Sequence, residues 1–431
     1  MFGAPLNMSL CDPTPCFHEM TPFTDRQHNE LLSFVKILTC RNVVPIEPLK
    51  TSIEQLQFPA DHIQCPLKTA GEAIILNDML ASFLSSGQSG HVIAVSGGFG
   101  PDGHYYVVGA GNTGKKGVHR PNDDLCTTLA RACEAFILGS TMPLDPGDMS
   151  AILVASLDIC HADVSRRLKS MTQAASSTGT LDKQGWQPYS NFVSDAAVLQ
   201  YDLKRWKELE PQKKTEVATG YGQLLNDASE LWDKLDSIQY DHKVKVIYDL
   251  NTIAGGLQLL RRFPRGTRVV IKWPQFLSPI GGDRVRCQSL QHAGCQLHCE
   301  IYLALYILFS ESDVQFHSFM VEENIRVFTI GCSKESCVGC WDILLGLARQ
   351  ESRNHPQYVC RTRRSHGKCY QFCCLTPHVD ALPPSLRQTV TGPRQIQMLQ
   401  SLNDALKDSH QKFRQRVESF SNRHTSQGHR Y

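Results

Sequence analysis

The sequence lacks any run of about 18 apolar residues, the length that a membrane-spanning helix needs. It also lacks a signal peptide, because residues 1–20 have neither a charged start nor an apolar core. We therefore expect a chain with no membrane partner, located in the cytoplasm or the nucleus.

An excess of charge of one sign is also missing, since the formal net charge is only +2. Charge alone therefore does not predict binding to nucleic acid or to a membrane surface. The 17 cysteines do not follow the paired spacing of a disulfide framework, which excludes a small secreted scaffold. We expect reduced, partly buried thiols. The 431 residues allow two or three domains, or one domain with a large insertion.

Two short motifs with metal-binding side chains each begin an apolar run. His298 and Glu300 form an H-x-E motif before one run, and Cys337 and Cys340 form a C-x-x-C motif before another. Residues 325–330 lie between them and alternate as a strand does. The predicted order is an H-x-E helix, a strand and a C-x-x-C helix.

These residue types suit a zinc-dependent hydrolase. Zn²⁺ prefers nitrogen and thiolate ligands in a tetrahedron, and a catalytic site keeps one position for water. His298, Cys337 and Cys340 would supply three ligands to one Zn²⁺ per chain, and the positive end of a helix favours the thiolates. Glu300 would take a proton from the water, the hydroxide would attack an amidine carbon, and Glu300 would return the proton to the departing amine. This is the chemistry of nucleobase deaminases.

The rest of the chain indicates an α/β core that is interrupted by helices. We expect a helix from about Gly71 to Ser85, and then a β-hairpin. One strand is expected over Arg268–Trp273, and the helix after Cys340 is expected to reach about Arg349. The predicted domains are an N-terminal arm (1–59), a discontinuous core (60–122 and 285–380), a mainly helical insertion (123–284), and a C-terminal polar helix and tail (381–431).

The order of these elements resembles the cytidine deaminase-like superfamily. The chain is most similar to a family, widespread in fungi, that carries an HAE helix, an IGCSK-x-SC-x-x-C stretch and a downstream SHGK strand. Here these read HCE at 298–300, IGCSKESCVGC at 330–340 and SHGK at 365–368. The resemblance implies a three-layer α/β/α fold, one zinc ion and hydrolytic deamination.

The resemblance also implies substrate-binding positions. Asn112 at the end of the hairpin would contact substrate, although a turn asparagine is an equal alternative. His366 in SHGK is a candidate pocket residue, against an ordinary strand histidine. Ser336 is a third candidate substrate-binding residue; it stands where most of these deaminases have proline, and a serine can cap the helix that follows.

Two alternatives to the deaminase remain open. Cys332 or Cys299 could supply a fourth ligand, which would give a closed structural zinc site and a non-catalytic binding module. Cys332, Cys337 and Cys340 also follow the C-x4-C-x2-C spacing of plant-type [2Fe–2S] ferredoxins, with Cys369 downstream. That reading gives His298 and Glu300 no role.

The substrate is not defined by these motifs beyond a nucleobase, which could be free, in a nucleoside or nucleotide, or in single-stranded RNA or DNA. Two basic groups could guide a phosphate backbone, although solvated charge is the more ordinary interpretation. They are Arg261, Arg262, Arg265, Arg268 and Lys272, and then Arg361, Arg363, Arg364 and Lys368. Nearby aromatic side chains could stack a base; they are Tyr358, Tyr370 and Phe372.

Overall fold

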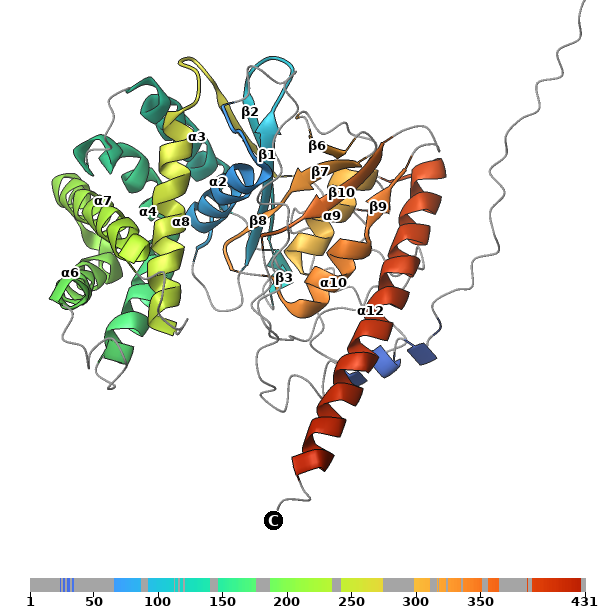
Figure 1. Ribbon diagram of the computed structural model, residues 1–431. Coiled ribbons are helices and arrows are strands. Elements are labelled where there is room, and N and C mark those ends of the chain that lie inside the picture. Colours follow the sequence, from blue (N-terminus) through green and yellow to red (C-terminus); the bar gives the residue numbers. More distant parts are fainter. Residues whose placement is uncertain are drawn as a thin grey trace, which may run out of the picture.

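The computed structural model has helices on both sides of a central group of β-strands (Figure 1). It describes residues 24, 26–27, 29–31, 33–34, 66–86, 92–111, 113–114, 117–118, 121–139, 146–175, 187–234, 242–273, 298–310, 316, 318–322, 325–334, 336–350, 356–363, 386 and 390–427.

The expected hairpin is present and forms the first sheet. Strands β1 (Ile93–Phe99) and β2 (Tyr105–Gly111) pair antiparallel, with Val95 opposite Gly109. Gly103 has a φ of 76° in the turn between them, a conformation that residues with a Cβ rarely adopt. The full order of this sheet is β5-β2-β1-β8. The strand expected near residue 270 is β5 (Val269–Lys272), and it pairs parallel to β2 at the edge.

The second sheet has the order β6-β7-β10-β9. Its central strands, β7 (Ile325–Thr329) and β10 (Gln357–Arg361), run parallel, whereas β6 (Phe319–Glu322) and β9 (Ala348–Arg349) pair antiparallel. The chain leaves β7 and enters β8 (Gly331–Cys332) after one residue, and β8 pairs with β1. One continuous segment therefore joins the two sheets.

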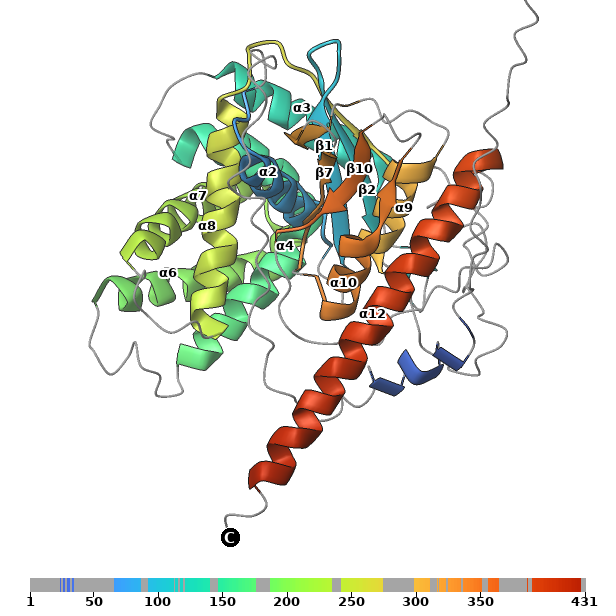
Figure 2. The same cartoon turned by 45° about the vertical axis from the view of Figure 1, so that its right-hand side comes forward.

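Helices cover both faces of these strands and make three layers (Figure 2). Helix α2 (Ala70–Phe83) packs on β1, β7 and β8. Helix α9 (Cys299–Phe309) packs on β1, β2 and β10, and α10 (Val338–Gly346) packs on β10 and α9. Burial on both faces explains why β1 is buried along almost its whole length instead of alternating between buried and exposed residues. The predicted α/β/α core is confirmed.

A mainly helical region separates β2 from α9 in the sequence, as predicted. Helices α4, α7 and α8 pack against one another, and α8 also packs on α2. The residues at which the insertion begins and ends stay a prediction. No helix in the described ranges is long and apolar enough to cross a membrane. The helices are α3 (Asp123–Leu138), α4 (Pro146–Ala175), α6 (Gln187–Lys204), the short 3₁₀ helix η2 (Trp206–Glu208), α7 (Pro211–Lys234) and α8 (His242–Arg261).

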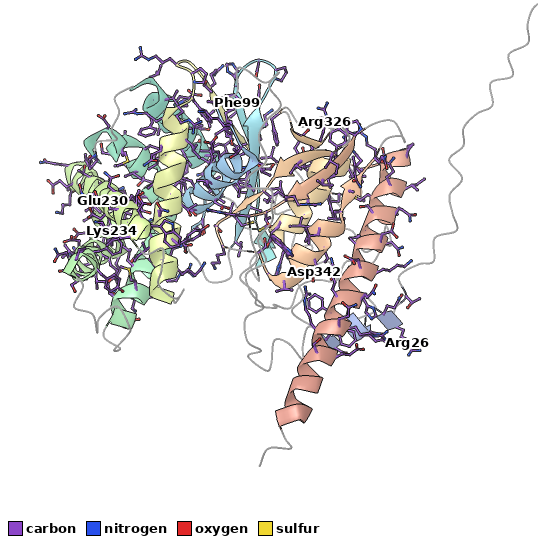
Figure 3. The ribbon with its side chains drawn as sticks, in the orientation of Figure 1. Arg26, Phe99, Glu230, Lys234, Arg326 and Asp342 are labelled. Atoms are coloured by element: carbon purple, nitrogen blue, oxygen red, sulfur yellow. The ribbon has the colours of Figure 1, made fainter. Side chains whose placement is uncertain are left out.

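The long helix α12 (Gly392–Gln427) lies along α9 and α10. The Arg416 guanidinium binds the Asp342 carboxylate, which lies on the side of α10 next to α12 (Figure 3). Because α12 places Ala405 against Gly346, a side chain larger than hydrogen at 346 would clash. Helix α10 ends there, so the expectation that it reaches Arg349 was wrong, and β9 instead pairs with β10.

Helix α2 lies very close to Gly331, the first residue of β8. A Cβ at this glycine would lie 2.2 Å from the backbone of Asn77 and Asp78. The Asn77 amide donates to Thr329 Oγ1 (3.0 Å) and accepts from the Tyr105 hydroxyl (3.1 Å). The Asp78 carboxylate accepts from the Cys332 backbone N–H at 2.8 Å. These contacts fix the end of β7 and the start of the segment that leads to Cys337.

We predict that Gly331→Ala destabilises the protein by about 3 kcal/mol, because the helix backbone would have to move away from the strand. Gly220→Ala is the control, since a Cβ at this exposed helical position would meet only Leu199, at 3.9 Å. It should raise the free energy of unfolding by up to about 1 kcal/mol. Urea unfolding followed by circular dichroism measures both changes, and equal effects would contradict the close approach.

Candidate metal centre

The His298 side chain points at both cysteines of the C-x-x-C motif. His298 is the residue before α9 and has an extended backbone (φ −74°, ψ 143°). Its Nδ1 lies 3.0 Å from Cys340 Sγ and 3.6 Å from Cys337 Sγ. The predicted helix–strand–helix order therefore brings one nitrogen and two sulfurs together.

The two cysteines take their positions from the start of α10. Cys337 is the N-cap residue, and its sulfur accepts from the Cys340 backbone N–H at 3.4 Å. Because α10 begins at Val338, the expectation that Ser336 caps this helix was wrong, and the Cys337 sulfur has that role. The positive end of the helix dipole favours negative charge on both sulfurs.

His298, Cys337 and Cys340 form a group that could hold a metal ion. Their three donor atoms lie within 4.8 Å of one another, and within the described part of the chain no other such group was found. Both sulfurs are buried, with Cys337 2% and Cys340 0% exposed. One imidazole nitrogen with two sulfurs is a donor set that Zn²⁺ accepts, and three protein ligands leave a fourth position open.

Contacts within the group set the protonation of its members. Burial opposes charge on His298, but the Cys337 sulfur outweighs it and raises the pKa of His298 to about 9. A hydrogen bond from Cys340 holds the pKa of Cys337 well below its ordinary value, with His298 adding to the effect. Burial and the Cys337 charge raise the pKa of Cys340 well above its ordinary value. At neutral pH the group is therefore an imidazolium, a thiolate and a thiol.

Glu300 lies in the first turn of α9, close enough to His298 and Cys337 for their charges to affect its ionisation. It is only 3% exposed, and burial raises the pKa of its carboxyl. The Cys299 thiol contacts Glu300 Oε2 at 3.4 Å. A buried carboxyl with a raised pKa is suited to accept and donate a proton near neutral pH.

The other candidate residues either lie outside the donor group or fall outside the described residues. Cys332 and Cys299 do not belong to the donor group, because Cys332 Sγ contacts Ser336 Oγ (3.9 Å) and Cys299 contacts Glu300. The alternatives that need a fourth thiolate gain no support from this geometry. Asn112, His366 and Cys369 lie outside the described residues, so their roles stay predictions.

A cleft that the motifs did not predict lies beside the donor group. It has about 470 Å³ of empty space, part of it open to solvent. Ser336 and Cys332 form one wall, while Arg167 and Tyr248 come from the helical insertion. Lys334, also in this lining, was visible in the sequence inside the IGCSK stretch. No sequence motif marks Arg167, which lies within a helical stretch of the insertion.

The comparisons with known proteins agree with the position of this centre. A family model described as OTT_1508-like deaminase matches residues 297–375, less than a fifth of the chain. This segment includes the three donor residues and Glu300, and it is similar to deaminases. The finer assignment to the family with the HAE, IGCSK-x-SC-x-x-C and SHGK motifs stays a prediction. No curated protein and no solved structure matches the chain.

We predict that the protein binds about one zinc ion per chain, and that His298→Ala, Cys337→Ser and Cys340→Ser each remove most of it. Cys299→Ser and Cys332→Ser should retain the metal, because neither sulfur belongs to the donor group. Inductively coupled plasma mass spectrometry after dialysis measures the zinc content. Loss of zinc in Cys332→Ser would instead favour a closed structural site.

Zinc binding should also release protons. The metal needs a neutral imidazole and two thiolates, so His298 and Cys340 must each lose a proton, about two in total near pH 7.5. Above a pH of about 9 His298 is already neutral, and the number should fall towards one. Calorimetry in buffers of different ionisation enthalpy counts these protons. Release that does not change with pH would contradict the assigned protonation.

Proposed function

We propose that this chain is a zinc-dependent hydrolase that deaminates a nucleobase. The observation that carries the proposal is the approach of His298 Nδ1 to the sulfurs of Cys337 and Cys340, next to the buried Glu300. The deaminase model that matches the same segment supports it.

His298, Cys337 and Cys340 would hold the metal. When bound, zinc supplies Lewis acidity, which lowers the pKa of a water molecule to near 7. The chain contributes a dry environment for this chemistry, because both sulfurs and Glu300 are almost completely buried. Charge interactions are stronger in such surroundings than in water.

Glu300 would move the proton. In its ionised form a carboxylate oxygen accepts a proton from the attacking water, and the protonated carboxyl then donates it to the amino nitrogen that leaves as ammonia. The raised pKa of Glu300, caused first by burial, favours both halves of this transfer. The substrate carbon is the amidine carbon of a base, C4 of cytosine or C6 of adenine in the known reactions of this type.

The predicted guidance of a phosphate backbone by the first basic group finds little support. Arg261 is buried, donates to the Phe136 carbonyl and pairs with Asp148 at 3.2 Å. Arg262 pairs with Glu72 at 2.7 Å. Because these two charges have internal partners, we propose a small nucleobase-containing substrate ahead of a single strand of RNA or DNA.

We predict that Glu300→Gln lowers ammonia release by roughly a thousandfold while zinc content stays the same, because the proton carrier is lost but no metal ligand is. An ammonia-coupled assay over nucleosides, nucleotides and single-stranded RNA and DNA measures the rate. Glu230→Gln is the control, since this exposed side chain lies on α7, far from α10 (Figure 3). Equal rates in Glu300→Gln and the unaltered protein would refute the mechanism.

A further inference from the structure

The cleft beside the metal centre lies where the helical insertion meets the segment before α10. Its lining comes from α2, α4 and α8 on one side, and from residues 330, 332–334, 336 and 362–363 on the other. Figure 2 shows α2, α4 and α8 together on the side of the strands opposite α9 and α10. The charged groups of its lining are three cations and two carboxylates: Arg167, Lys334 and Arg363, and Asp78 and Asp249.

Arg167 is already neutralised. Its guanidinium pairs with Asp163 at 2.8 Å and Asp249 at 3.2 Å, and it donates to the Ser333 carbonyl at 2.7 Å. Two carboxylates balance its single charge, so its main effect is to hold the segment before α10 against α4. It forms a fixed wall of the cleft.

Lys334 is different, because no carboxylate among the described residues lies within ion-pair distance of its ammonium group. It is partly buried, and its nearest charged neighbours include Arg166 and Arg167 as well as Asp163. A cation that is held among other cations and partly removed from water gains from an incoming anion.

Arg363 faces the same cleft from the end of β10. Its guanidinium lies 5.0 Å from the centre of the Tyr248 ring and contacts Thr252 Oγ1 at 3.5 Å. An arginine that is fixed by an aromatic ring and a hydroxyl is well oriented for bidentate binding to phosphate oxygens.

The two carboxylates that line the cleft have partners of their own. Asp249 pairs with Arg167 and, at 3.7 Å, with Lys245, and Asp78 accepts from the Cys332 N–H. Their negative charge is thus partly offset, whereas the positive charge of Lys334 has no carboxylate partner among the residues that the structure describes. The balance inside the cleft favours an anion.

The lining of the cleft extends to the residue next to the donor group. Ser336, which lines it, directly precedes Cys337. About 470 Å³ of its space is partly open to solvent, so a ligand can enter from outside. Two cationic side chains, Lys334 and Arg363, suit a single phosphate group better than the row of phosphates on a strand.

We propose that this cleft binds the phosphate of a mononucleotide through Lys334 and Arg363, so that its base is directed past Ser336 towards the metal centre. The inference that the base points towards the metal centre rests on the proposed deaminase function. The inference that the cleft binds the phosphate does not.

Calorimetric titration with CMP, AMP and GMP, with their nucleosides and with ribose 5-phosphate tests this proposal without turnover. Each cationic side chain contributes charge-assisted hydrogen bonds, so the preferred monophosphate should bind at least about tenfold more tightly than its nucleoside. Lys334→Gln and Arg363→Gln should each remove most of that preference and also weaken ribose 5-phosphate. Lys334→Arg should keep the preference.

Lys213→Gln is the matched control, because Lys213 is an exposed lysine of α7 that pairs with Glu216. Zinc content reports whether each variant keeps the centre intact. Equal affinity for nucleoside and monophosphate, or a preference that survives both glutamine variants, overturns the proposal. So does a ten-base single strand that binds more tightly than any monophosphate, because the ligand would then be nucleic acid.

The binding and turnover results separate the two proposals. A phosphate preference that depends on Lys334, with no ammonia from any substrate, supports the cleft and refutes the deaminase. Ammonia released from nucleosides, together with equal binding of nucleosides and monophosphates, supports the deaminase and refutes phosphate binding in the cleft.

Discussion

The metal centre depends on how closely α2 lies against Gly331. Only a glycine fits beneath the backbone of Asn77 and Asp78, and those two side chains then bind Thr329 and the Cys332 N–H. This contact sets where the segment between the two sheets ends and therefore where α10 can begin. Since Cys337 is the N-cap of α10, the position of its sulfur follows from a contact on the opposite face of the strands.

The same arrangement explains the electrostatics of the donor group. Two helices, α9 and α10, begin at the centre, and their positive ends favour the negative charge that a metal-binding cysteine needs. His298 holds a proton beside Cys337, so one charge pair stabilises the buried group in the protein alone. Glu300 lies near this group, and its burial raises the pKa of its carboxyl towards neutral pH. The starts of α9 and α10 therefore both position the donor atoms and influence their protonation.

The donor group could be predicted from the sequence because each of its residues stands at a local feature. His298 and the two cysteines stand at helix starts, and a strand between them fixes the order of the elements. The cleft could not be predicted in this way. Arg167 reaches it from α4 through tertiary packing, and no local pattern reports such a contact. The end of α10 was also missed, because Ala348 and Arg349 pair with β10 instead of continuing the helix. Contacts between residues that are not neighbours in the sequence determine both the cleft and the end of α10.

The bond from Arg167 to the Ser333 carbonyl joins the helical region to the donor group. A side chain from the helices between β2 and α9 thereby holds the backbone that leads to Cys337. The same region supplies β5, which completes the edge of the first sheet. The helical region and the α/β core therefore support each other through specific contacts. Loss of the Arg167 guanidinium would release the backbone before Cys337, so the position of a donor sulfur depends on a side chain far from it in sequence.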